Sequence, residues 1–200
     1  MDTRTRRLFI AFSVEIGTEL EAAIKRTRIG AQQRRMEVNW VPKENLHVTL
    51  NFLGATPPER IPDLERLIES VGQKHAAFST SIRGFGAFPD TRHARVLWAG
   101  IRNSRALSEL QWALREALVQ SGFPQEDREF VPHLTLGRLR KARAVDDLLS
   151  PYVRTTFDDL RIESIALYES IQRGPHPVYE VIKTFPLSGP GRNLSDGQMS

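Results

Sequence analysis

Cysteine is absent from this sequence of 200 residues. The chain therefore forms no disulfide bond and offers no thiolate to a metal, and its composition fits a reducing compartment. Long hydrophobic runs are missing too, since the apolar run at residues 8–14 is interrupted by Ser13 and followed at once by Glu15. Such a run is too short for a signal sequence or a membrane span. We therefore expect a cytoplasmic protein that has no membrane partner.

A large excess of one sign of charge is also missing. The formal net charge is +4, from 28 Lys and Arg against 24 Asp and Glu. This excess is too small for tight, salt-resistant binding to duplex nucleic acid, and it suits a small phosphate ligand or a single phosphorylated end better. The remaining composition, 40% hydrophobic and 26% charged, is that of an ordinary globular protein.

One short pattern occurs twice in the chain. Residues 46–50 read LHVTL and residues 132–136 read PHLTL. Because side chains alternate along a strand, a histidine and a threonine two residues apart share one face, and the aliphatic residues take the other. A single histidine on a strand is more often structural than catalytic, but here two of the five histidines fall in the same pattern. The predicted catalytic and phosphate-holding residues are His47, Thr49, His133 and Thr135.

Helical and strand patterns alternate along most of the chain. They predict an α+β protein with a bilobal, pseudo-two-fold fold, in which two antiparallel-rich sheets face a central cleft and helices cover the outside. We expect one domain over residues 1–187, with the junction between its lobes near residues 100–104. Residues 188–200 are rich in Gly, Ser and Pro without periodicity, and they predict a disordered tail.

Two imidazoles in one site are suited to moving two protons in one reaction. Because histidine titrates near neutral pH, one ring can accept a proton while the other, protonated, donates one. A hydroxyl beside each ring can donate a hydrogen bond to a non-bridging oxygen of a phosphate. Phosphoryl transfer requires this kind of positioning and charge stabilisation, and it needs no metal if enough donors converge.

A metal site is the main alternative use of paired histidines. Zinc sites usually recruit a third protein ligand, yet neither motif contains Asp or Glu, and the residues that share the histidine face are threonines. A threonine nucleophile is disfavoured because no elbow motif surrounds either threonine. The sequence therefore predicts no metal and no cofactor.

The repeated motifs resemble the twin His-x-Thr motifs of the two-histidine phosphoesterase superfamily. Other segments resemble more closely the bacterial and archaeal RNA 2′,3′-cyclic phosphodiesterases, also called 2′-5′ RNA ligases. The resemblance extends over roughly residues 7–187. Its blocks are RLFIA at 7–11, WVP at 40–42, FLG at 52–54, RVLWAG at 95–100, PHLTLGR at 132–138, LYES at 167–170 and FPL at 185–187.

This resemblance implies an RNA 2′,3′-cyclic 3′-phosphodiesterase, a hydrolase that opens a 2′,3′-cyclic phosphate to a 2′-phosphomonoester without metal. It implies that His47 is the proton donor and His133 the acceptor, while Thr49 and Thr135 hold phosphate oxygens. Arg138, five residues after His133, would add a charged donor to the phosphate. The implied partners are RNA ends or oligonucleotides that carry the cyclic phosphate, and no obligate protein partner is indicated.

Phe12 and Tyr179 are further candidates, for stacking on the terminal base, because stacking suits sequence-tolerant recognition of single strands.

Two other functions stay open. One is a non-catalytic RNA-end binding module, which needs hydrogen-bond donors but not a matched acid and base. The other is reversible 2′-5′ RNA ligation, in which the same two groups act in the opposite direction.

Overall fold

The computed structural model describes residues 5–124, 129–173 and 176–189. Within these ranges the chain forms nine strands, four α-helices and three short 3₁₀ turns. The strands are β1 (Arg6–Ser13), β2 (Val38–Trp40), β3 (His47–Thr56), β4 (Phe78–Phe88), β5 (Ala94–Ile101), β6 (His133–Arg143), β7 (Thr156–Ile162), β8 (Ser164–Arg173) and β9 (His176–Pro186). The helices are α1 (Thr18–Gln33), α2 (Ile61–Gly72), α3 (Arg105–Gln120) and α4 (Asp146–Leu149), and the 3₁₀ turns are η1 (Lys43–Asn45), η2 (Pro58–Arg60) and η3 (Ser150–Tyr152).

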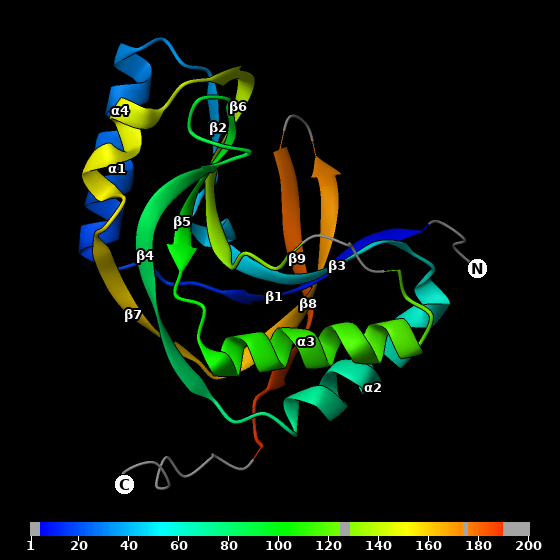
Figure 1. Ribbon diagram of the computed structural model, residues 1–200. Helices are drawn as coiled ribbons and strands as arrows, with labels where there is room; N and C mark the ends of the chain where they lie inside the picture. Colours follow the sequence, from blue (N-terminus) through cyan, green and yellow to red (C-terminus); the bar gives the residue numbers. More distant parts are fainter. Residues whose placement is uncertain (1–4, 125–128, 174–175, 190–200) are drawn as a thin grey trace, which may run out of the picture.

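The nine described strands form one curled antiparallel sheet (Figure 1). Its order is β7-β4-β5-β6-β3-β1-β8-β9, with β2 paired to β6. This order is symmetric about the junction of β6 and β3, because three strands continue outward on either side. The predicted α+β class with antiparallel strands is therefore confirmed, and the two predicted sheets are the two halves of one sheet.

Each half of the sheet has its own pair of helices. Helices α2 and α3 pack on each other, with α3 against β3 and α2 against β8 and β9, whereas α1 and α4 pack together beside β7 (Figure 1). The chain passes from one half to the other several times. The predicted junction at residues 100–104 falls on one of these passages, from β5 to α3. The half β3-β1-β8-β9 therefore combines strands from both ends of the chain, whereas the half β7-β4-β5-β6 consists of strands from its middle.

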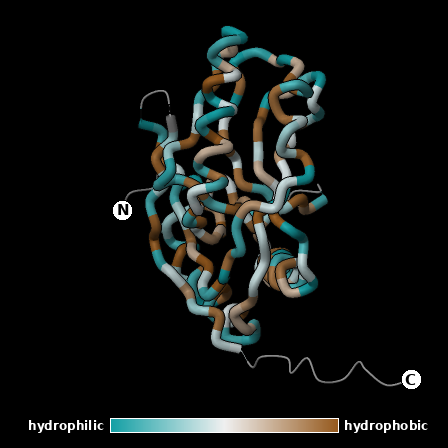
Figure 2. Tube along the Cα trace, turned by 90° about the vertical axis from the view of Figure 1, so that its left-hand side faces the viewer, coloured by the Kyte–Doolittle hydropathy of each residue, from teal (hydrophilic) through white to brown (hydrophobic). Residues whose placement is uncertain are grey.

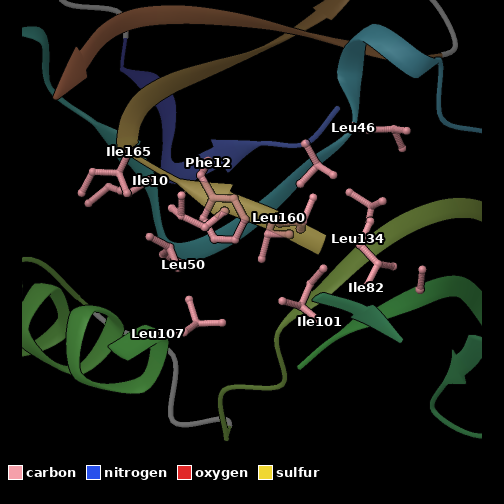
Figure 3. Close-up of a cluster of buried hydrophobic side chains, with 14 of the residues drawn as sticks. Ile10, Phe12, Leu46, Leu50, Ile82, Ile101, Leu107, Leu134, Leu160 and Ile165 are labelled. Atoms are coloured by element: carbon pink, nitrogen blue, oxygen red, sulfur yellow. The ribbon is translucent and has the colours of Figure 1, made fainter. Parts of the chain in front are cut away.

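A continuous hydrophobic core lies between the helices and the sheet. Helix α1 contributes residues spaced three or four apart, and the strands contribute every second residue, so that hydrophobic and hydrophilic residues alternate along the trace (Figure 2). Figure 3 shows the part of the core beneath β1, β3 and β6, with Leu50, Leu134 and Phe12 among its side chains. No helix in the described ranges is long and apolar enough to cross a membrane.

The first residues of the predicted tail are attached to the fold. The backbone N–H of Ser188 donates to the carbonyl of Gly72 at 3.2 Å, and that of Gly189 donates to the carbonyl of His75 at 3.0 Å. Ser188 also forms a β-bridge with Ala76. These contacts correct the predicted start of the tail at residue 188, because the end of α2 offers these two residues backbone partners. Residues 190–200 lie outside the described part of the chain.

Candidate active site

Strands β3 and β6 meet at the middle of the two motifs, where Val48 lies opposite Leu134. In antiparallel pairing, the residue before one member of such a pair lies beside the residue after the other. The histidine of each motif is therefore a neighbour of the threonine of the other. Val48 and Leu134 are fully buried in the core, and the four polar side chains are half-buried on the opposite, open face of the sheet.

The same contact fixes both imidazoles. Nδ1 of His47 lies 2.8 Å from the carbonyl oxygen of Asn45, and Nδ1 of His133 lies 2.7 Å from the carbonyl oxygen of Val131. Because a carbonyl oxygen only accepts hydrogen bonds, each Nδ1 carries a proton and donates it. Nε2 is therefore the atom of each ring that gains or loses a proton. It accepts a proton in the neutral ring and donates one in the charged ring.

Aromatic rings enclose the imidazole of His47. Its centroid lies 4.9 Å from that of Tyr179, in an edge-on arrangement, 5.0 Å from that of Phe9 and 6.1 Å from that of Tyr168. Phe9 in turn stacks on Tyr168 at 5.1 Å. These contacts restrict the ring and separate it from water on several sides.

The imidazole of His133 has a different aromatic setting. Phe88 meets it edge-on at a centroid distance of 4.9 Å, and Trp98 lies at 6.4 Å. Trp98 in turn packs on the backbone of Gly86, where a Cβ atom would lie only 2.2 Å from an indole carbon. A glycine at this place in β4 is therefore required for the indole to lie beside His133.

Burial lowers the pKa of both histidines. Loss of water around the rings is the main cause for His47 and for His133, and the positive charge of Arg138 lowers both pKa values further. The hydrogen bonds to the Asn45 and Val131 carbonyls oppose this shift. The positive charge of His133 also lowers the pKa of His47, so the two rings lie within electrostatic reach of each other.

A β-bulge brings Arg138 to the open face. Thr135 pairs with Trp98 and Gly137 pairs with Leu97, so Leu136 is an extra residue without a partner in β5. After it, the side chains of β6 that would point to the core point to the open face instead. Arg138 is consequently exposed and lies within electrostatic reach of both histidines and Tyr179. In the described part of the chain its guanidinium has no hydrogen-bond or ion-pair partner, and neither do the hydroxyls of the two motif threonines.

The structure separates the two predicted stacking residues. Tyr179 contacts His47 at the site, whereas Phe12 is 2% exposed in the core on the other face of β1. The prediction for Phe12 is therefore wrong. The side chains of β1 are apolar on both faces, and the alternation of the strand places Phe9, not Phe12, beside His47.

Phe52 is a site residue that the sequence reasoning missed. It lies five residues after His47, as Arg138 lies five residues after His133, and β3 has a matching bulge at Leu50. The ring of Phe52 is 51% exposed, and Phe52 pairs with Phe9 of the neighbouring strand β1, at a ring-centroid distance of 6.2 Å. The equal spacing from the two histidines was the signal in the sequence that could have identified it.

Metal ligands are sparse around the two motifs. Within residues 5–124, 129–173 and 176–189, no group of three His, Asp or Glu side chains is arranged to hold a metal ion. The polar groups that converge on the open face are two imidazoles, two hydroxyls and one guanidinium, a set of donors suited to a phosphate.

A curled antiparallel sheet that presents two such motifs on one face defines a hydrolase of the phosphodiesterase class. The family model of the 2′-5′ RNA ligase superfamily matches residues 17–173, and the chain belongs to this superfamily. An RNA 2′,3′-cyclic phosphodiesterase of Methanothermobacter thermautotrophicus is 31% identical over 184 residues, which cover 90% of this chain and 98% of that protein.

Solved structures agree with this assignment. The crystal structure of TT0787 of Thermus thermophilus superimposes with a TM-score of 0.75 at 30% identity, covering 92% of this chain and 100% of that one. The crystal structure of E. coli LigT complexed with 3′-AMP gives a TM-score of 0.69 at 25% identity, covering 92% and 99% of the two chains.

Proposed function

We propose that this protein hydrolyses the 2′,3′-cyclic phosphate at RNA ends to a 2′-phosphomonoester, without a metal, with His47 and His133 as a paired general acid and base. The observation that carries the proposal is the matched fixation of the two imidazoles. Both Nδ1 atoms donate to backbone carbonyls, which leaves two Nε2 atoms on one face for proton transfer. The relatives named RNA 2′,3′-cyclic phosphodiesterase support the substrate class.

The reaction requires two proton transfers at one phosphorus. Water attacks the phosphorus and gives a proton to the Nε2 of the neutral histidine. The bond from phosphorus to the 3′-oxygen breaks, and the protonated histidine gives its Nε2 proton to that oxygen. The product carries a 2′-phosphate and a 3′-hydroxyl. The base histidine is left holding the proton taken from water, and the acid histidine has lost the proton now on the 3′-oxygen.

We assign the acid role to His47 and the base role to His133. The ring of His47 is enclosed by Phe9, Tyr168 and Tyr179, so its Nε2 is suited to a substrate oxygen rather than to bulk water. The more open ring of His133 is suited to activating a water molecule. Burial lowers the pKa of both rings, so in the free protein His133 is neutral and able to accept a proton.

The phosphate would be held by Thr49, Thr135 and Arg138. The two hydroxyls have no partner among the described residues, so each is free to donate to a non-bridging oxygen. Arg138 adds a charged donor that stabilises the negative charge of the transition state. A bound phosphate would also raise the pKa of both histidines, which supplies the protonated acid.

The terminal base would lie against the aromatic rings on β3 and β9. Phe52 offers an exposed ring, and Tyr179 offers a half-buried one beside His47. Base stacking on such rings tolerates any sequence. The structure of E. coli LigT with 3′-AMP supports a nucleotide as the ligand class.

The test is hydrolysis of a nucleoside 2′,3′-cyclic phosphate by the purified protein in excess EDTA, with the product identified by phosphorus NMR. A 2′-phosphomonoester is expected at an undiminished rate. A 3′-phosphomonoester, or a rate abolished by EDTA and restored by zinc or manganese, would contradict the proposal.

Two other functions are outcomes of the same experiment. An RNA-end binding module would bind the cyclic phosphate without turning it over. Adding an oligonucleotide with a 5′-hydroxyl tests ligation, because that hydroxyl can replace water as the nucleophile while the same acid and base act. Joined product alongside 2′-phosphate would show both directions.

A further inference from the structure

The two motif strands differ in charge beyond the site. We compare the positions five to ten residues after His133 with those five to ten residues after His47. The first set, in β6, contains four basic side chains. The second set, in β3 and the residue after it, contains none. Because β3 forms the same kind of strand without charge, the fold does not require basic residues at these places. The residues are Arg138, Arg140, Lys141 and Arg143 on one side, and Phe52, Gly54, Ala55 and Pro57 on the other.

The tip of the β4–β5 hairpin adds to this positive charge. Arg143 pairs in register with Ala94, so Arg92 and Arg95 lie beside the end of β6. We call the exposed residues Arg92, Arg95, Arg140, Lys141 and Arg143 the basic edge. It lies at the upper end of the molecule in Figure 1, where β6 approaches α4 and the end of α1.

Nearby carboxylates neutralise the basic edge only in part. Glu37 forms an ion pair with Arg140 at 3.1 Å, and Asp90 accepts hydrogen bonds from the backbone N–H groups of Arg92 and His93. Asp146 accepts a hydrogen bond from the Thr91 hydroxyl.

Of the five members of the basic edge only Arg140 has a carboxylate partner for its side chain among the described residues. Lys141 and Arg95 make no side-chain hydrogen bond there, and Arg143 contacts only the carbonyl of Arg34, at 3.4 Å. These three side chains can therefore turn to a ligand without breaking an ion pair.

We propose that the basic edge binds backbone phosphates of the RNA that precedes the terminal nucleotide, which makes an oligonucleotide rather than a mononucleotide the preferred substrate. This inference rests on the proposed function. The edge begins two residues beyond Arg138, which lies beside the catalytic pair. Along a strand, the six residues from Arg138 to Arg143 span roughly 16 Å, so the positive charge extends outward past more than one phosphate.

Binding of this kind depends on salt and not on sequence. Each phosphate that a basic side chain neutralises on a single strand releases counterions and adds about 0.7 to the slope of log affinity against log salt. Three contacts add about 2 to that slope. A mononucleotide carries no preceding phosphate, so its hydrolysis gains nothing from the edge.

The experiment compares two triple variants of the full chain. The first, Arg95→Ala/Lys141→Ala/Arg143→Ala, removes three of the four edge charges that have no ion pair among the described residues and leaves the Arg140–Glu37 ion pair intact. The second, Lys25→Ala/Arg26→Ala/Arg154→Ala, removes the same number of exposed charges from α1 and from the turn that precedes β7. The substrates are a nucleoside 2′,3′-cyclic phosphate and a five-nucleotide RNA with the same end.

We expect the edge variant to lose about tenfold or more in kcat/KM on the five-nucleotide RNA at low salt, and its salt slope to fall by about 2. Its kcat/KM on the mononucleotide should equal that of the unaltered protein, and the control variant should resemble the unaltered protein on both substrates. Equal losses in the two variants, or an unchanged edge variant, would overturn the inference.

A binding measurement separates this inference from the proposed function. A fluorescein-labelled five-nucleotide RNA ending in a 3′-phosphate is titrated with each protein, and its anisotropy is followed. Weaker binding by the edge variant alone supports the basic edge even if no cyclic phosphate is hydrolysed. Equal binding by all three proteins overturns it even if hydrolysis is observed.

Discussion

Val48 of β3 lies opposite Leu134 of β6, and the two His-x-Thr motifs are arranged around this pair with near two-fold symmetry. The symmetry extends to the carbonyl that each Nδ1 contacts and to the bulge that follows each motif. It ends five residues after each histidine, where one half has Phe52 and the other has Arg138. The symmetric pair of imidazoles therefore lies between an exposed aromatic ring on one side and an exposed positive charge on the other.

Replacing Arg138 should change the pH dependence as well as the rate. Its charge lowers the pKa of both histidines, so in Arg138→Ala both pKa values rise toward the ordinary value. kcat/KM falls as the acid loses its proton, and this alkaline limb should therefore move to higher pH. Loss of the charged hydrogen bond should also lower the maximum by about 10- to 100-fold.

Arg138→Lys is the matched control for that prediction. It keeps the positive charge but not the planar fork of donors. The alkaline limb should stay where it is in the unaltered protein, while the maximum is still reduced. A limb that stays in place in Arg138→Ala would show that the charge of Arg138 does not act on the catalytic pair.

The motif threonines should act through their hydroxyls. Thr49→Val and Thr135→Val keep the shape of the side chain on the open face but remove the donor. Because each hydroxyl is expected to donate to a charged phosphate oxygen, each variant should lose about 10- to 100-fold in kcat/KM. Unfolding in urea should change little, because neither hydroxyl has a protein partner in the described ranges. An unchanged kcat/KM would exclude a role in phosphate binding.

The sequence predicted the paired motifs because strand alternation is a local property. His47, Thr49, His133 and Thr135 share one face as their spacing predicted. The start of α3 is local in the same way, because Ser104 Oγ accepts a hydrogen bond from the backbone N–H of Leu107 at 3.2 Å.

Other features were not local and could not be read from the chain. Strand β1 is buried on both faces, so its alternation does not indicate which face contacts the site. The sequence therefore predicted Phe12 as a stacking residue, although Phe9 is the residue beside His47. The bulge at Leu50 has no glycine or proline beside it, whereas Gly137 directly follows the bulge at Leu136. The joining of two sheets into one depends on the long-range pair Val48 and Leu134, which no spacing specifies.

Phe52 should contribute to binding of the base and not to the chemistry. Phe52→Ala removes an exposed ring, and one stacked base is worth about 1–3 kcal/mol, so kcat/KM on a nucleoside 2′,3′-cyclic phosphate should fall by roughly 5- to 150-fold. Glycerol 1,2-cyclic phosphate has no base, and its hydrolysis should be unaffected. Val181→Ala, a change at another exposed apolar side chain, is the control. Equal losses on both substrates would show that Phe52 supports the fold instead.

The histidine pair should make the folded state less stable in acid. Burial lowers the pKa of both rings in the folded chain, so the unfolded chain takes up protons first as the pH falls through about 6.5. The free energy of unfolding should therefore be smaller at pH 5.5 than at pH 7.5. Urea unfolding of the double variant His47→Gln/His133→Gln should show a smaller difference between these pH values. The same difference in both proteins would mean that other groups cause it.

The roles of the two histidines can be separated by the leaving group. If His47 protonates the departing 3′-oxygen, the loss in His47→Ala should largely disappear on a nucleoside 2′-phosphodiester of p-nitrophenol, because p-nitrophenolate leaves without a proton. His133→Ala should stay impaired on both substrates, because water still needs a base. On the cyclic phosphate each single variant should lose about 10²- to 10⁴-fold. The near-symmetric fixation of the two rings allows the opposite assignment as well, so rescue of His133→Ala alone would reverse the roles and leave the pair intact.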